Sequence, residues 1–439
     1  MTSGAPAAPD SRRRPGFANV VWGVGLASLA LRLVLQRLEP LPPSKSVLAD
    51  EVWYTRVAHN VLLGRGFVSP YWPISRAPTA LHAPLTVLLL LPASVVQPHG
   101  YTAQRATIAL LGALAVVVIG YVARELAGPR VGIIAAVLAA VYPGLWVNDL
   151  VATSEAPAML LLATILLVTL RYRRAPSTWS LVWLGLLTGL LALDRAELAL
   201  LGLLLVVPAV VASSRGTQRR AATMARALAV VGVLAVCVVT PWSAYNQSRF
   251  HRTVLISNNL GQTLVGANCQ ESYYGPLTGY DGRYCYLPVL RGLPKGSNEA
   301  AADAYFRHRA VQYAVAHWHR WPLVAVMREA WLWSLWRPGW TVFMSGVYLG
   351  RPRWIAWSEI VSFWLLAPLA LYGFIVARRR RVPVAQLVTL IAFTAVLGML
   401  VVGHLRYRLP TELAVVVLGA IGIDQLLFPR RQRGPAPTG

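Results

Sequence analysis

The chain has 439 residues, with 41 Lys or Arg against 17 Asp or Glu, so its formal net charge is +24. Hydrophobic residues make up 56% and charged residues only 13%, whereas an ordinary soluble domain carries roughly 25% charged residues. This composition excludes a soluble basic protein, and no nucleic-acid partner is expected. The excess of arginine is instead expected to report membrane topology.

The first apolar run extends from Phe17 to about Leu35 and follows three consecutive arginines, Arg12 to Arg14. At about 1.5 Å per residue it is long enough to cross a bilayer. A cleaved signal peptide is the alternative, but no small-residue cleavage site follows the run. We therefore expect a membrane anchor, preceded by a cytoplasmic tail over residues 1–16.

Further apolar runs of spanning length raise the expected number of transmembrane helices to about ten. They lie near 104–124, 131–148, 156–170, 178–193, 197–213, 227–242, 358–377, 383–403 and 410–428. A shorter run, 81–96, is interrupted by Pro84 and Pro92. If it does not cross, all the basic clusters fall on the N-terminal side of the membrane, in agreement with the positive-inside rule. The run 81–96 is therefore predicted to be a juxtamembrane or re-entrant helix.

This topology divides the chain into a membrane-embedded core and one large loop. The predicted parts are a transmembrane core at 17–242 with a first outer loop at 37–103, a large extracytoplasmic loop at 243–357, C-terminal transmembrane helices at 358–428 and a cytoplasmic tail at 429–439. The protein is expected in the plasma membrane with both termini cytoplasmic. Because most acids of the embedded part fall on the extracytoplasmic side, any chemistry is expected there.

The three cysteines fall in two environments. Cys269 and Cys285 share the large loop, and an oxidising compartment favours a disulfide between them over two free thiols. Cys237 lies within a predicted span, where it is interpreted as a small buried apolar residue. The cysteine and histidine spacings do not match those of metal sites.

The segment from Asp50 to Gly64 has the pattern of an amphipathic helix, and it is expected to lie in the outer membrane interface. Adjacent helical residues point about 100° apart, so at most one of Asp50 and Glu51 can be a reacting carboxylate. Two interpretations of Asp50 stay open from the pattern alone. It is either the N-cap of this helix or a catalytic group.

Several short motifs follow one another on the same predicted side of the membrane. They are Ala49-Asp50-Glu51-Val52-Trp53-Tyr54, Thr153-Ser154-Glu155, Pro241-Trp242 with Tyr245-Asn246, and His404-Leu405-Arg406-Tyr407-Arg408-Leu409-Pro410. In this order they resemble the polyprenyl-phosphate-sugar-dependent glycosyltransferases of the GT-C fold, the superfamily of protein O-mannosyltransferases and aminoarabinose transferases. The resemblance implies an all-α polytopic membrane fold with outer juxtamembrane helices. It also implies inverting transfer of a monosaccharide from a polyprenyl-phosphate donor to a lipid, glycan or protein acceptor of the cell envelope.

The resemblance, together with residue chemistry, suggests roles for the polar residues of the outer side. Asp50 is the expected general base, and Glu155 either positions the acceptor or caps the fourth span. Arginine binds phosphate bidentately, so three arginines are expected at the donor phosphate, unless they only anchor span ends: Arg195, Arg406 and Arg408. His82 stands where some relatives have a basic residue, and it either contacts the phosphate when protonated or binds nothing. Glu51, Asp149 and Tyr54 are expected to shape the site or contact the acceptor.

The resemblance implies no obligatory metal cofactor, although convergence of Asp50, Asp149 and Glu155 on a divalent ion stays open. Two other classes of protein compete with the glycosyltransferase. A transporter or lipid flippase is expected to place charges at mid-membrane in repeated halves, but here the acids lie at span ends and no repeat is evident. An inactive scaffold is disfavoured by the ordered acid and arginine pairs. The aromatic residues of 299–336 are interpreted mainly as an interfacial belt or loop core.

Overall fold

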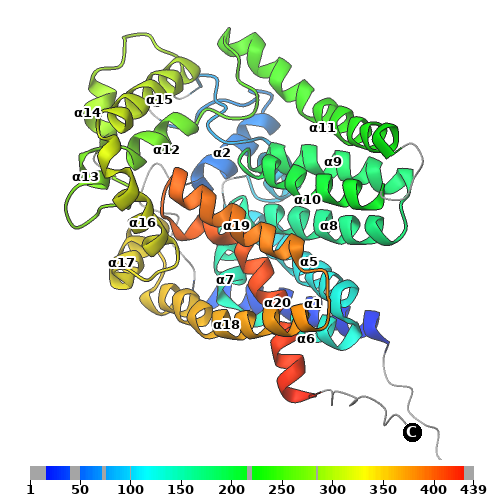
Figure 1. Cartoon of the computed structure of the whole chain (residues 1–439). Helices are drawn as coiled ribbons and strands as arrows, with labels where there is room; N and C mark the ends of the chain where they lie inside the picture. Colours follow the sequence, from blue (N-terminus) through cyan, green and yellow to red (C-terminus); the bar gives the residue numbers. More distant parts are fainter. Residues whose placement is uncertain are drawn as a thin grey trace, which may run out of the picture.

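The structure is a computed structural model that describes residues 16–39, 50–71, 76–98, 100–214, 220–282 and 285–429. Within these residues the chain is almost entirely helical (Figure 1), and the only extended pairing is one isolated β-bridge between Val68 and Pro78. The all-α prediction is confirmed. Most of the two predicted cytoplasmic tails, including Arg12 to Arg14, lies outside the described residues.

Each predicted span corresponds to a helix or to a bent pair of helices. They are α1 (Phe17–Leu38), α5 (Thr102–Ala127), α6 (Pro129–Val141) with α7 (Pro143–Trp146) and the 3-10 turn η1 (Val147–Leu150), α8 (Glu155–Arg174), α9 (Thr178–Asp194), α10 (Leu198–Ser213), α11 (Arg220–Phe250), α18 (Arg353–Arg379), α19 (Ala385–Leu400) and α20 (Leu409–Leu427). In the described part, six helices are long and apolar enough to cross a membrane, and the pair bent by 58° after α6 makes up to seven. The shorter apolar helices are α9, α10 and α19.

The bend after α6 follows from its sequence. Tyr142 precedes Pro143 and takes an extended backbone conformation, as the ring of a following proline favours. The chain then passes through α7 and η1, and α8 begins at Glu155. The bend therefore places the segment 147–155 at one end of the helical bundle.

The run 81–96 forms two short helices, α3 (Leu85–Leu89) and α4 (Leu91–Val96), and neither is long enough to cross a membrane. The predicted amphipathic helix is α2 (Asp50–Leu62), and the protein buries residues on both its polar and its apolar side. Glu51 and Thr55, on its predicted polar side, are buried along with Trp53. The reason is that the polar side of α2 pairs with polar groups inside the protein.

The long loop is also helical. It contains α12 (Leu260–Ala267), α13 (Gln270–Tyr273), α14 (Tyr286–Arg291), α15 (Glu299–Ala316), the 3-10 turn η3 (Trp318–Arg320), α16 (Trp321–Leu332) and α17 (Pro338–Leu349). Cys269 and Cys285 form a disulfide with their Cα atoms 6.0 Å apart. Cys237 is exposed on α11, so its predicted burial is wrong, because this side of α11 faces away from the bundle.

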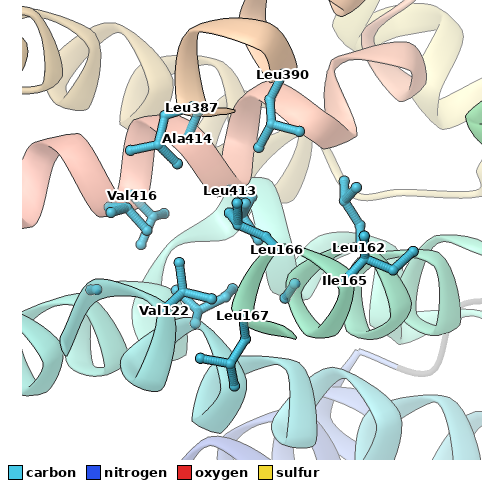
Figure 2. Packing of buried hydrophobic residues seen from close by; sticks show 14 of the residues in the cluster. Val122, Leu162, Ile165, Leu166, Leu167, Leu387, Leu390, Leu413, Ala414 and Val416 are labelled. Carbon is cyan, nitrogen blue, oxygen red and sulfur yellow. The ribbon is translucent and has the colours of Figure 1, made fainter. Parts of the chain in front are cut away.

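Helix α20 lies at the centre of the bundle and contacts α18, α6, α19, α8 and α5. Figure 2 shows Leu413 and Ala414 of α20 among leucines of α8 and α19. Gly373 of α18 permits the closest approach, because a Cβ atom there would lie 1.8 Å from the carbonyl oxygen of Leu418. This packing fixes α20, and with it the 3-10 turn η4 (Leu405–Arg408) that precedes it.

Candidate active site

Four charged residues from separate elements meet where η4 approaches the start of α8. We call Asp50, Glu155, Arg195 and Arg406 the charged cluster. Arg406 bridges two carboxylates, with its Nη1 2.7 Å from Asp50 Oδ2 and its Nη2 2.6 Å from Glu155 Oε1. Arg195, directly after α9, places Nη1 3.2 Å from the same Glu155 oxygen. Three of the predicted site residues are thus brought together around Glu155.

Exposure within the charged cluster is graded. The side chain of Glu155 is 2% exposed and that of Arg195 is 12% exposed, whereas Asp50 and Arg406 are 22% and 27% exposed. Glu155 is therefore the most buried member of the cluster, and it forms ion pairs with both arginines. Asp50 and Arg406 are the members that an incoming molecule reaches.

The charges around Asp50 keep its carboxylate ionised. Burial alone would raise the pKa of Asp50, but Arg406 and, to a lesser extent, His82 hold that pKa below its ordinary value. Asp50 is the first residue of α2, and its carboxylate faces Arg406 and His82. Its position therefore combines a helix start with a charged contact to the cluster.

His82 lies beside Asp50, with Nε2 3.6 Å from Oδ1, and its ring packs against the rings of Trp53 and Tyr54. Burial lowers the pKa of His82 more than Asp50 raises it. The imidazole is therefore neutral near pH 7 and brings no positive charge for a phosphate. This geometry favours a packing role beside Asp50 over the predicted phosphate contact.

A small cavity adjoins the two arginines of the cluster. It is lined by Arg195, Glu197, Leu198, Leu397, Arg406, Tyr407, Leu409 and Pro410. Its charged wall comes from Arg195, Arg406 and Glu197, whose Oε1 lies 2.8 Å from Arg195 Nη2. Its apolar wall includes Leu198 of α10 and Leu397 of α19. The cavity thus lies where the charged cluster meets the apolar side chains of α10 and α19.

Glu51 points away from Asp50, as the helical geometry predicts. It forms a bidentate ion pair with Arg105 of α5, in which both nitrogen–oxygen distances are 2.7 Å. It also accepts a 2.9 Å hydrogen bond from the backbone N–H of Ala152. Tyr54 is buried, and burial raises the pKa of its hydroxyl far above the ordinary value. Both residues tie α2 to the segment that leads into Glu155.

Asp149 does not converge with Asp50. Its Oδ2 accepts a 2.6 Å hydrogen bond from Arg32 Nε, and both side chains are buried. In the part of the chain that the structure describes, no group of three or more His, Cys, Asp or Glu is arranged to hold a metal ion. Instead, the guanidinium of Arg406 lies between Asp50 and Glu155, so these residues do not fit the divalent-ion alternative.

The prediction that Arg408 faces the donor is wrong. Arg408 is fully buried, forms an ion pair with Glu412, and its guanidinium lies over the ring of Phe363. Residues two apart in a 3-10 turn point to different sides, because each residue turns the helix by about 120°. Arg406 and Arg408 therefore serve different parts of the protein.

Arg408→Ala is expected to destabilise the fold without weakening donor binding. Removing one member of a buried ion pair typically costs about 3 to 5 kcal/mol, because the partner carboxylate stays buried without its cation. Thermal unfolding in detergent should show a lower midpoint, while the folded fraction keeps its donor KM. The double variant Arg408→Met with Glu412→Leu should recover much of the midpoint. A raised donor KM at unchanged midpoint would contradict this assignment.

Three buried arginines that the sequence did not single out bind groups in or next to the segment 147–155. Arg32 pairs with Asp149, Arg105 with Glu51, and Arg351 Nη2 lies 2.8 Å from Asn148 Oδ1. One of them carries a readable signal, since Arg32 interrupts the first apolar run and an ionisable residue inside a span marks a functional region by default. The other two lie at span ends, where arginine is ordinary.

Comparisons with known proteins identify the fold. Residues 82–245 match the family model described as dolichyl-phosphate-mannose-protein mannosyltransferase. Among curated proteins there is no significant match. The apo oligosaccharyltransferase of Archaeoglobus fulgidus superposes with a TM-score of 0.53 at 15% identity, over 94% of this chain and 51% of that one. The chain has the GT-C fold.

The same oligosaccharyltransferase, AglB, in complex with an inhibitory peptide and a dolichol-phosphate gives a TM-score of 0.52 at 14% identity, over 95% of this chain and 52% of that one. ArnT from Cupriavidus metallidurans bound to undecaprenyl phosphate gives 0.46 at 15% identity, over 93% of this chain and 78% of that one. This GT-C chain thus spans about half the length of AglB. The predicted fold class and the stated resemblance are confirmed.

Proposed function

We propose that this GT-C protein is a membrane glycosyltransferase that uses a polyprenyl-phosphate-linked monosaccharide as donor. The observation that carries the proposal is the bridge of Arg406 between Asp50 and Glu155, beside a cavity with one charged and one apolar wall. The family description names a dolichyl-phosphate sugar, and AglB is known with dolichol-phosphate, which supports the same class of donor here.

The donor phosphate would bind between Arg195 and Arg406. Both guanidiniums stay charged next to lipid and offer paired donors that match phosphate oxygens. The polyprenyl tail would leave the cavity past Leu198 and Leu397 into the bilayer, so the apolar part of the donor never crosses the charged cluster. The buried carboxylate of Glu155 forms ion pairs with both arginines and so keeps them in position.

Asp50 is the proposed general base. When phosphate binds, Arg406 shares its positive charge with a second anion, which weakens its hold on Asp50 and raises the basicity of that carboxylate. The acceptor hydroxyl oxygen then attacks the anomeric carbon, the bond from this carbon to the phosphate oxygen breaks, and Asp50 takes the hydroxyl proton. The phosphate leaves as an anion between Arg195 and Arg406. A single displacement of this kind inverts the anomeric centre.

The acceptor is proposed to be a lipid, glycan or protein of the cell envelope, reached from the extracytoplasmic side. A reporter that is active only outside the cytoplasm should be silent when fused after Arg381 and active when fused within 270–300, because the basic clusters keep the first position inside. The reverse pattern would place the charged cluster on the cytoplasmic side and contradict the proposed face.

The proposed reaction needs no divalent metal, because Arg406 supplies the positive charge between the two acids. Transfer by the purified protein should therefore continue at its full rate in excess EDTA. As a control, Arg406→Ala should not regain activity when Mg²⁺ or Mn²⁺ is added. Loss of wild-type activity in EDTA with recovery on adding either ion would show that the acids hold a metal during turnover.

The direct test of the proposed function uses purified protein in detergent or nanodiscs with a panel of synthetic polyprenyl-phosphate sugars and a cell-envelope extract. We expect one donor to release free polyprenyl phosphate, and the sugar to appear on an extract component by mass spectrometry. A protein that consumes no donor of the panel, at full folded yield, would contradict the proposed function.

A further inference from the structure

The last part of the long loop carries an apolar surface on α16, α17 and the turn between them. We call residues 321–349 the loop hairpin. Leu335 is 70% exposed, Phe343 52%, Val347 44% and Trp336 43%. Helix α17 has the sequence PGWTVFMSGVYL, without a charged residue. Several exposed apolar side chains on neighbouring elements are typical of a surface that meets a membrane or a partner.

This surface continues the lipid-facing side of α18. Helix α17 packs beside α18, and three residues separate them along the chain (Figure 1). Helix α18 is long and apolar enough to cross a membrane. It exposes Trp354 and Trp357 near its start and Leu365 near its middle, the last at 69%. Exposed apolar side chains of a spanning helix face lipid, so the loop hairpin lies next to lipid.

The contact between the loop hairpin and α18 indicates how deep the loop hairpin lies in the membrane. The rings of Trp333 and Phe363 stack at 5.9 Å, and Trp364 Nε1 donates to the carbonyl oxygen of Trp333 at 3.4 Å. Phe363 lies about 15 Å along α18 from its start, at about 1.5 Å per residue. The whole of α18 measures roughly 40 Å, against about 30 Å for the hydrocarbon core. If the excess of about 10 Å is shared between the two ends of α18, Phe363 lies roughly 10 Å inside the hydrocarbon core, and Trp333 lies beside it. That is the depth reached by the apolar face of an interfacial helix.

We propose that the loop hairpin lies in the membrane interface, and that lipid covers its apolar surface. The turn between the two helices places exposed Trp336 beside exposed Arg337. Tryptophan prefers the headgroup level, and arginine extends its guanidinium from an apolar surface toward lipid phosphates. A helix of twelve residues is too short to cross, so α17 lies along the interface and does not span the bilayer.

The loop hairpin contacts the segment that leads to the charged cluster. Arg328 of α16 donates to the carbonyl oxygens of Met399 and Leu400, at 2.9 and 3.2 Å, at the end of α19. Gly403 lies against the same arginine, because a Cβ atom there would be 2.3 Å from the Arg328 carbonyl oxygen. The chain reaches Arg406 three residues later. This inference concerns the lipid contact alone and does not depend on the proposed activity.

The test measures which quencher reaches a fluorophore on the loop hairpin. Cys237→Ala removes the free cysteine of the described residues, and the Cys269–Cys285 disulfide stays oxidised. Leu335→Cys and Phe343→Cys are labelled with bimane in this background, and the full chain is placed in phospholipid nanodiscs. Two matched controls are Leu365→Cys on α18, 69% exposed, and Leu287→Cys on α14, 53% exposed. Quenching by doxyl-labelled lipid is compared with quenching by aqueous iodide.

We expect the labels at positions 335 and 343 to behave like the label at position 365. Doxyl lipid should quench both strongly, and iodide should quench both several-fold less than the label at position 287. A ratio of lipid to iodide quenching no greater than that at position 287 would overturn the proposal. Protection from both quenchers, as contact with a second copy of the chain would give, would overturn it as well.

Discussion

Asp50→Asn is expected to give a folded, donor-binding protein whose transfer rate is lower by roughly 10²- to 10⁴-fold, the usual effect of removing a general base. Asparagine begins a helix nearly as well as aspartate, so α2 should keep its start and the folded yield should stay close to wild type. The amide cannot take the proton of an acceptor hydroxyl. The measurement is the transfer rate at matched protein level, together with the donor affinity.

A neutral substitution of an acid outside the charged cluster serves as the control. Glu271→Gln, on α13 in the long loop, should leave the rate unchanged. Glu51→Gln should lower stability more than it lowers the rate per folded molecule, because Glu51 holds Arg105 and the Ala152 N–H and does not face the donor. Near-wild-type turnover by Asp50→Asn would refute the assignment of the base.

Arg406→Ala is expected to weaken use of the donor by about 2 kcal/mol or more, which is roughly 30-fold in donor KM, because a charged hydrogen bond to phosphate is lost. The rate should fall too, since the same guanidinium would stabilise the leaving phosphate. Arg406→Lys should recover only part of both, because an ammonium lacks the paired donors of a guanidinium. Donor-dependent kinetics on synthetic polyprenyl-phosphate sugars give both values.

Arg353→Ala is the matched control for charge alone, because Arg353 is an exposed arginine at the start of α18, outside the charged cluster. It should leave the donor KM unchanged. If Arg406→Ala kept wild-type kinetics, Arg406 would only hold the two acids together, and the donor phosphate would have to bind elsewhere.

The sequence predicted the helices well because each span is a continuous apolar run, and apolar length needs no knowledge of neighbours. The distribution of the basic clusters likewise predicted that 81–96 does not cross, and the structure has two short helices there. The place of α2 could not be predicted in this way. Its polar side looked like a water-facing side, but Glu51 pairs with Arg105 from another helix, and only the tertiary fold brings that partner into reach.

The candidate site, too, could be predicted from the sequence only in part. Order along the chain and side of the membrane were sufficient to select Asp50, Glu155, Arg195 and Arg406, which the fold brings together. They could not separate Arg406 from Arg408, because that distinction depends on the 3-10 geometry of η4 and on the buried Glu412. They also gave no sign that Asp149 is already paired with Arg32.

We propose that this chain consumes a polyprenyl-phosphate sugar with Asp50 as the general base. The most direct measurement replaces the gene at its own locus with the Asp50→Asn variant and follows lipid-linked sugars and cell-envelope glycans by mass spectrometry. We expect one polyprenyl-phosphate monosaccharide to accumulate and one envelope component to lose the same sugar, at unchanged levels of the protein. Unchanged donor pools and unchanged envelope glycans in this strain would contradict the claim.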